Sequence, residues 1–370
     1  MVVPDNIGVE EQDQYNHKRM FVTSAETNNL SKLPDNLVDS ILERLPIQDA
    51  VRTSILSRNW RYTWTTMRLL VLDEHFSNKL AKNGTFGYSG FIRVINQLFY
   101  FLKAPILKVH LFIPKMLLDI FQEVNQWILR LSRDCVRKLV LINSNQSYQL
   151  PSYLFYCSEL RYLKLKNCIF KPPLEFQGFV YLEVLWLQNI AFGANLSETF
   201  NVCSFLELLE VSLLPLQFSI AENIPNWLPR AADRLARLQF YNFNFSALDQ
   251  LQGALFMLRN SPNLEQLSVI LGLGLRNMHL DEKSALTYLA ASESFDQSLN
   301  RLKTINMKLI TGSRPLLLFI KLLLDHSPAL EVLSIQLSVT CNVHEKYNFA
   351  KDVMRLPRAS SKVELLFLDP

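Results

Sequence analysis

The order of apolar and polar residues between Leu33 and Trp64 predicts a cluster of short helices. Leu37, Ile41 and Leu45 lie four positions apart, which places them on one face of a helix. Pro46 follows directly, and a proline at that position ends the helix. The pattern therefore predicts a first helix with one apolar face.

Two further short helices are expected after this proline. Asp49 is a good N-cap for the second, and the third carries Trp60 and Trp64, which are again four positions apart. Three short helices cannot bury all of this apolar surface among themselves. Either the rest of the chain or a partner must therefore cover it.

A Leu-x-x-Leu-x-Leu pattern recurs from about residue 105 to the end of the chain, and the clearest copy is Leu160, Leu163 and Leu165. The last copy is assigned to Val363, Leu366 and Leu368. Successive copies are 22 to 38 residues apart, a period typical of a leucine-rich-repeat solenoid. The central positions are Val109, Leu139, Leu163, Leu185, Leu209, Leu238, Leu267, Ile305, Leu333 and Leu366.

Helical spacing of apolar residues lies between several of these copies, at 91–102, 248–258 and 316–324. Strands that alternate with helices predict an α/β protein, here an irregular arc or horseshoe. Another α/β fold with leucine-rich strands is the alternative.

Composition limits the kind of protein this is. Hydrophobic residues make up 49% of the chain and charged residues 19%, which predicts a globular protein. The net charge of +4 comes without a clustered basic stripe, so we expect no nucleic-acid partner. Residues 1–29 lack an apolar period and are expected to form a disordered tail.

Neither a signal peptide nor a membrane span is expected. The start of the chain has no basic region followed by an apolar run, and the longest apolar run, 316–324, is too short to span a bilayer. The five cysteines are scattered without a Cys-x-x-Cys pair, which fits a reducing compartment. We expect an intracellular protein of the cytoplasm, the nucleus or both.

No catalytic motif is present. The chain has no Gly-x-Ser-x-Gly and no His-Glu-x-x-His, and its six histidines lack metal-ligand spacing. Cys168 takes a structural position in its repeat and is not expected to act as a thioester nucleophile. We therefore expect no catalytic residue, no bound metal and no cofactor.

The helical segment resembles an F-box, a module found near the start of many plant proteins. The residues that carry the resemblance are Leu33-Pro34-Asp35, Ile41-Leu42, Leu45-Pro46, Asp49-Ala50-Val51, Ser54-Ile55-Leu56-Ser57-Arg58 and Trp60-Arg61. The resemblance implies docking on a SKP-type adaptor and, through it, on a cullin ubiquitin ligase. An ordinary helical cap over a core is the alternative.

The last 70 residues are similar to the FBD domain of plant F-box/FBD/LRR-repeat proteins. The most specific part is the string Pro357-Arg358-Ala359-Ser360-Ser361-Lys362. Residues 311–315 depart from the family, because acidic residues usually stand there. The expected division is a tail at 1–29, the F-box at 30–70, a linker and helix at 71–104, the repeats at 105–300 and the FBD at 301–370.

These resemblances predict an adaptor subunit with two binding surfaces. The expected contacts with the SKP-type adaptor are Leu33, Pro34, Leu37, Ile41, Leu45, Pro46 and Trp60. The second surface is the concave sheet face between the buried leucines, and it is expected to bind a target protein for ubiquitination. A scaffold that joins the complex without delivering a target for degradation is the alternative function.

The expected concave face carries five basic residues and one acidic residue, which indicates an acidic or phosphorylated target. Tyr162, Trp186 and Tyr241 are the expected anchors, and lateral packing between strands is the alternative role of these rings. Together with Lys164, Glu210 and Gln239 they form the candidate target site. The full face is Lys138, Tyr162, Lys164, Lys166, Trp186, Gln188, Glu210, Arg237, Gln239, Tyr241, Gln266, Ser268, Asn306, Lys308, Ser334 and Gln336.

Overall fold

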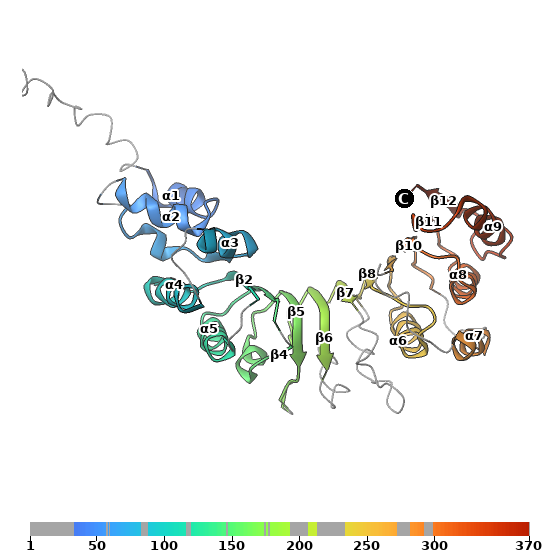
Figure 1. Cartoon of the computed structure of the whole chain (residues 1–370), viewed down its shortest axis with the longest axis horizontal. Helices are drawn as coiled ribbons and strands as arrows, with labels where there is room; N and C mark the ends of the chain where they lie inside the picture. Colours follow the sequence, from blue (N-terminus) through green and yellow to red (C-terminus); the bar gives the residue numbers. More distant parts are fainter. Residues whose placement is uncertain are drawn as a thin grey trace, which may run out of the picture. The chain divides into compact units, whose positions relative to one another are not determined.

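A computed structural model of the chain consists of two compact units (Figure 1). The first unit combines Met1–Met67 with Leu102–Ala104, and the second combines Arg68–Phe101 with Pro105–Pro370. The expected tail at 1–29 lies outside the residues that the structure describes. These are 33–56, 58, 60–82, 88–115, 120–145, 147–173, 175–176, 178–192, 206–212, 234–271, 282–291 and 299–369.

The first unit begins with two α-helices, α1 (Asp35–Leu42) and α2 (Ile47–Arg52). Pro34 and Pro46 are their N-caps, which suits residues without a backbone N–H to satisfy. The second helix therefore starts before Asp49, which lies in its first turn instead of at its cap. Buried side chains in this unit include Leu42, Ile47, Ala50, Trp60 and Trp64.

The end of the expected second helix is a short 3₁₀ turn, η2 (Thr53–Ile55), and the described part of the expected third helix contains another, η3 (Thr63–Thr66). The threonines explain why no regular helix continues here. Thr53, Thr63, Thr65 and Thr66 each donate a hydroxyl hydrogen bond to the carbonyl three residues earlier, at 2.6–2.9 Å. Such local bonds compete with the backbone pattern of an α-helix.

The second unit contains one long parallel sheet. Among the described residues its order is β1-β2-β3-β5-β6-β7-β8-β9-β10-β11-β12, and β4 pairs with β5. Strands that follow one another in the chain also lie next to one another in the sheet. Each strand and its connection therefore form one repeating unit, as the repeated pattern predicts. The strands are β1 (Leu69–Leu72), β2 (Lys108–Ile113), β3 (Lys138–Asn143), β4 (Tyr148–Gln149), β5 (Tyr162–Phe170), β6 (Val184–Phe192), β7 (Leu208–Ser212), β8 (Arg237–Tyr241), β9 (Gln266–Ile270), β10 (Thr304–Ile310), β11 (Val332–Leu337) and β12 (Glu364–Leu368).

The central apolar position of each repeat pairs with that of the next. Leu163 pairs with Leu185, and Leu185 with Leu209; each of the three is at most 2% exposed. Strand β1 was not predicted from the sequence, and it extends the same sheet by pairing with β2.

The last repeat is displaced by one residue from the predicted register. Leu333 pairs with Leu365, whereas the pattern had assigned Leu366 to that position. Strand β12 pairs with β11 alone among the described strands, and Leu365, Leu366 and Phe367 are all half-buried. Because the two faces of this strand differ little in burial, hydrophobic alternation fixes its register only weakly.

Helices fill many of the connections between strands, and Figure 1 shows α5, α6 and α8 on the same side of the sheet. On α5 the buried residues Val124, Trp127, Ile128 and Leu131 follow helical spacing. The helices and the 3₁₀ turn of this unit are α3 (Glu74–Lys82), α4 (Tyr88–Phe101), α5 (Phe121–Arg133), η4 (Ser152–Tyr156), α6 (Leu248–Arg259), α7 (Glu282–Ala291), α8 (Arg314–His326) and α9 (Val343–Met354).

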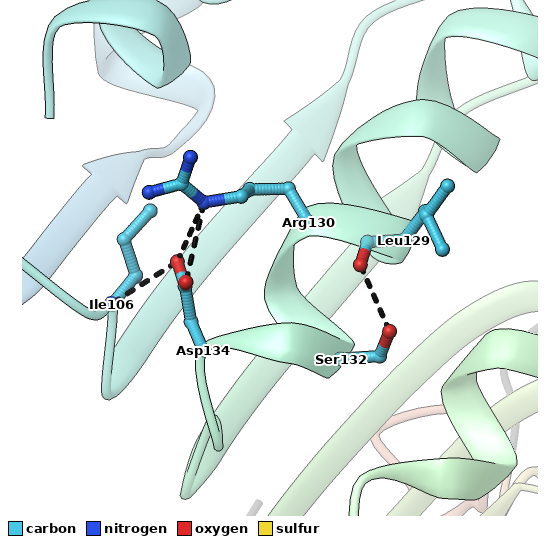
Figure 2. Close-up of polar contacts among 5 residues, drawn as sticks. All are labelled: Ile106, Leu129, Arg130, Ser132 and Asp134. Carbon is cyan, nitrogen blue, oxygen red and sulfur yellow. Dashed lines mark hydrogen bonds and ion pairs between the residues drawn. The ribbon is translucent and has the colours of Figure 1, made fainter. Parts of the chain in front are cut away.

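The end of α5 is bonded to the start of the neighbouring strand (Figure 2). Asp134, the C-cap of α5, accepts hydrogen bonds from Arg130 Nε at 3.1–3.2 Å and from the backbone N–H of Ile106 at 3.3 Å. These bonds fix the helix against the chain that enters β2.

Left-handed backbone occurs within or directly after several strands. Asn167, Asn189, Asn242 and Leu309 have φ between 53° and 57°, and each stands two positions after a buried residue of β5, β6, β8 and β10, respectively; Asn242 directly follows β8. Asparagine tolerates this conformation. The side-chain amides of Asn167 and Asn189 also donate hydrogen bonds to residues of the neighbouring strand. The Asn167 side-chain amide donates to the Asn143 carbonyl at 2.6 Å, and Asn189 donates to Asn167 Oδ1.

Candidate functional site

The F-box-like unit carries exposed apolar side chains along α1. Leu37 is 48% exposed and Ile41 38%, whereas Val38 and Leu42 on the other face are buried. Water-exposed apolar side chains on one helix face are typical of a surface that binds a partner.

The remaining expected adaptor contacts surround this helix. Pro34 and Pro46 are exposed at the starts of α1 and α2, and Leu33 and Leu45 are half-buried. Trp60 is only 3% exposed, so its side chain lies inside the protein. The adaptor contact of Trp60 and of the other six residues stays a prediction.

Three exposed residues of this unit were not among the expected contacts. Ile55 is 88% exposed, and Leu56 and Tyr62 are also exposed. Their exposure was not predictable from the pattern, because Ile55 was expected on the apolar face of the second helix, whereas η2 ends at this residue.

In the second unit the candidate target residues lie in register across the sheet. Lys164 on β5 pairs with Trp186 on β6, Trp186 with Glu210 on β7, and Glu210 with Gln239 on β8. Tyr162 and Tyr241 stand two positions before and after this row, on the same face.

Direct contacts join these side chains into what we call the sheet-face cluster: Lys138, Tyr162, Lys164, Trp186, Glu210 and Tyr241. The Lys164 ammonium lies 3.6 Å from the centre of the Trp186 ring, and that of Lys138 lies 4.4 Å from the Tyr162 ring. These are cation–π distances.

Trp186 also meets the edge of Tyr241, with ring centres 6.3 Å apart and planes at 63°. Tyr241 Oη donates a hydrogen bond to Glu210 Oε2 at 3.4 Å. The aromatic rings therefore pack against side chains of neighbouring strands and remain half-exposed. This arrangement is compatible with both expected roles, anchoring a target and lateral packing between strands.

Burial shifts the pKa values of three side chains in the cluster. It lowers the pKa of Lys164, and the nearby charges of Lys166 and Lys138 lower it further, while Glu210 opposes the shift. Burial also raises the pKa of Tyr162 and of Tyr241, and the Glu210 carboxylate adds to both shifts. The lowered pKa of Lys164 and the raised pKa values of the two tyrosines are those expected for half-buried side chains. The lysines place excess positive charge on the β3–β5 side of this face.

Comparison with known proteins shows one domain match and several similar plant proteins. The F-box domain family matches residues 30–72. An F-box/FBD/LRR-repeat protein of Arabidopsis thaliana is 27% identical over 414 residues, which cover 92% of this chain and 98% of that protein. A second Arabidopsis protein of that description is 33% identical over 50% of this chain and 40% of its own length. An FBD-associated F-box protein of the same plant is 25% identical over 83% of this chain and 78% of its own length.

The chain therefore contains an F-box domain and is similar over most of its length to F-box/FBD/LRR-repeat proteins of Arabidopsis thaliana. F-box proteins in general are adaptors that bring substrates to SCF-type ubiquitin ligases, and they are typically not catalytic. The names of these relatives indicate no enzymatic activity.

The FBD-like string at 357–362 is exposed except for Ser360, which is 5% exposed. The Ser360 hydroxyl donates to the Leu330 carbonyl at 2.6 Å, and the Ala359 N–H donates to the Leu324 carbonyl at 2.9 Å. These two bonds hold the connection between α9 and β12 against the end of α8 and the turn before β11.

The cysteines differ in exposure. Cys157 and Cys168 are buried, Cys135 is exposed, and Cys203 lies outside the described residues. Burial raises the pKa of Cys157 to about 12, and it raises that of Cys168 as well. A nucleophile needs the thiolate, so burial disfavours such a role for these two thiols.

Two searches over the described residues gave no site. They contain no group of three or more His, Cys, Asp or Glu side chains that could hold a metal ion. The described helices include none that is long and apolar enough to cross a membrane.

Proposed function

We propose that this chain is a substrate-recognition subunit of an SCF-type ubiquitin ligase. Its F-box docks on a SKP-type adaptor through Leu33, Pro34, Leu37, Ile41, Leu45 and Pro46, and the buried Trp60 supports this surface from inside the unit. Its sheet face captures a target protein through Tyr162, Lys164, Trp186, Glu210, Gln239 and Tyr241. The observation that carries the proposal is the exposed apolar face of α1 within the segment that matches the F-box family.

We also infer that the parallel sheet is the inner wall of a leucine-rich-repeat solenoid. Two observations support this inference: consecutive strands are adjacent in the sheet, and helices lie on one side of it. The proposed division places the F-box at 30–70, a linker and helix at 71–104, the repeats at 105–300 and the FBD at 301–370, where it closes the solenoid.

The proposed mechanism is proximity. One surface holds the target and the other holds the ligase, so the target stays at a high effective concentration near the activated ubiquitin. The chain supplies binding and orientation, and the transfer itself takes place on other subunits.

Co-purification with a plant SKP-type adaptor tests the F-box half of the proposal. We expect the full chain to co-purify, and we expect Leu33→Ala/Pro34→Ala and Leu37→Asp to lose the adaptor. Val339→Asp is the matched control, because Val339 is an apolar side chain exposed on the other unit. Equal co-purification of all variants would show that this face of α1 does not bind the adaptor.

Target abundance distinguishes delivery from scaffolding. A captured protein that accumulates when the proteasome is blocked, in cells that carry the wild type but not Leu37→Asp, supports delivery for degradation. A captured protein whose abundance does not change would support the scaffold function instead.

A further inference from the structure

The exposed face of the sheet has an uneven distribution of charge. Lys108, Lys138, Lys164 and Lys166 lie on this face of β2, β3 and β5. Lys108 pairs with Lys138, whereas Lys164 and Lys166 lie opposite Val140 and Ile142 of β3, so Lys164 is diagonal to Lys138. Glu210 on β7 is two strands away from the lysines of β5. Among the residues that the structure describes, no ion pair joins any of these four lysines to a carboxylate.

We propose that this face binds an extended acidic segment of the target protein, with its carboxylates on Lys138, Lys164 and Lys166. The inference rests on the proposed function of the sheet face and adds the chemistry of the segment that it binds. These lysines form no ion pair in the described part of the chain and repel one another, and Glu210 only partly offsets the effect at Lys164. An anionic segment placed over them relieves that repulsion.

The spacing of the lysines matches an extended peptide. Lys164 and Lys166 are two residues apart on one strand, which corresponds to about 6.6 Å along the chain. Side chains on one face of an extended peptide repeat at the same distance. Acidic residues at every second position therefore align with both ammonium groups.

Partial burial of Lys164 strengthens an ion pair that forms at this site. An ion pair on a fully exposed surface contributes little, because water screens it. Lys164 is held against Trp186 and is partly desolvated, so a carboxylate placed on it interacts in a less screened environment. Its ammonium has three N–H donors, and the ring contact leaves donors available for a carboxylate.

The same contacts disfavour single-stranded nucleic acid as the ligand. Nucleic-acid sites of this kind offer free aromatic faces on which bases stack. Here lysine ammonium groups cover one face of Tyr162 and one face of Trp186, and Tyr241 lies against Trp186 as well. The cluster therefore presents positive charge where a base would need an open ring.

Fluorescence anisotropy with a labelled decapeptide of alternating Glu and Ser tests the proposal on the full chain. We expect binding that weakens as salt rises, and affinity about tenfold lower for Lys164→Gln/Lys166→Gln. The matched control is Lys351→Gln/Lys362→Gln, which removes the same charge from exposed lysines of α9 and of the turn before β12. We expect less than a twofold change for that control.

Two further probes separate the alternatives. A decapeptide of sequence Glu-Glu-Ser-Ser-Glu-Glu-Ser-Ser-Glu-Ser has the same charge but no two acidic residues two positions apart, so we expect it to bind more weakly. A ten-residue oligothymidine that binds more tightly than the alternating peptide, with the same dependence on Lys164 and Lys166, would overturn the proposal in favour of nucleic acid. Equal loss of peptide binding in the two double variants would also overturn it.

The inference and the function on which it rests can fail separately. If a target protein depends on Trp186 but binds the Lys164→Gln/Lys166→Gln variant as well as the wild type, the acidic segment is wrong and the sheet-face function stands. If neither substitution affects any captured target, the sheet-face function itself fails.

Discussion

The ammonium of Lys164 lies 3.6 Å from the centre of the Trp186 ring on the adjacent strand. This contact holds a lysine and an aromatic side chain of the proposed target site in one arrangement. A surface that is already ordered loses less side-chain entropy on binding.

A double-mutant cycle measures this contact. We expect Lys164→Met and Trp186→Leu to show a coupling of about 0.5–1 kcal/mol in the free energy of unfolding, the range of a partly exposed cation–π pair. The longer Lys138–Tyr162 contact, at 4.4 Å, is the comparison, and a smaller coupling is expected there. Additive effects for both pairs would mean that the lysines do not rest on the rings in solution.

The FBD string supports a second prediction, because the buried Ser360 hydroxyl bonds the Leu330 carbonyl. Replacing Ser360 by Ala leaves that carbonyl without its donor, so we expect a loss of about 1–3 kcal/mol in chemical denaturation. Ser361→Ala is the control, because Ser361 is exposed and its loss costs little. Equal stability of the two variants would contradict a structural role for the Ser360 bond.

The repeat register was predictable from the sequence wherever one face of a strand is buried. Leu163, Leu185 and Leu209 are buried, whereas the residues directly before and after each are half-buried, so a one-residue slip would move all three leucines to the other face. That constraint weakens in β12, where Leu365, Leu366 and Phe367 are apolar in succession, and there the prediction was wrong by one residue.

The missed features depend on information that periodicity does not contain. Leu69–Leu72 reads as the end of the helical module, and only its pairing with β2 makes it a strand. The sheet-face row followed from the register, but the placement of Lys164 over Trp186 depends on rotamers of neighbouring strands.

The left-handed residue Leu309 provides a third prediction. Its φ of 57° is unfavourable for leucine, whereas Asn167, Asn189 and Asn242 have nearly the same φ. We expect Leu309→Asn to raise the free energy of unfolding by up to about 1 kcal/mol. Leu309→Ala removes the same apolar side chain without relieving the backbone, so it should be the less stable of the two in thermal unfolding. An alanine variant as stable as the asparagine variant would show that the backbone preference contributes nothing here.

A pH dependence is expected from His110 on β2, which lies in the same sheet row as Lys164 and Trp186. Burial lowers the pKa of His110 from its ordinary value of 6.5, the charges of Lys164 and Lys138 lower it further, and Asp73 opposes them. Its buried Nε2 has no hydrogen-bond partner in the described part of the chain. The folded protein therefore favours the neutral ring.

The sign of the effect follows from this lowered pKa. Above pH 6.5 the ring is neutral in both states and costs nothing; as the pH falls below 6.5 the unfolded chain takes up a proton first, and stability decreases until the folded-state pKa is reached. We expect a loss below about 1 kcal/mol, because water screens a half-buried side chain. Urea denaturation at pH 7.5 and pH 5.5 should show this loss in the wild type and a smaller one in His110→Leu. The same pH dependence in both proteins would assign it to other groups.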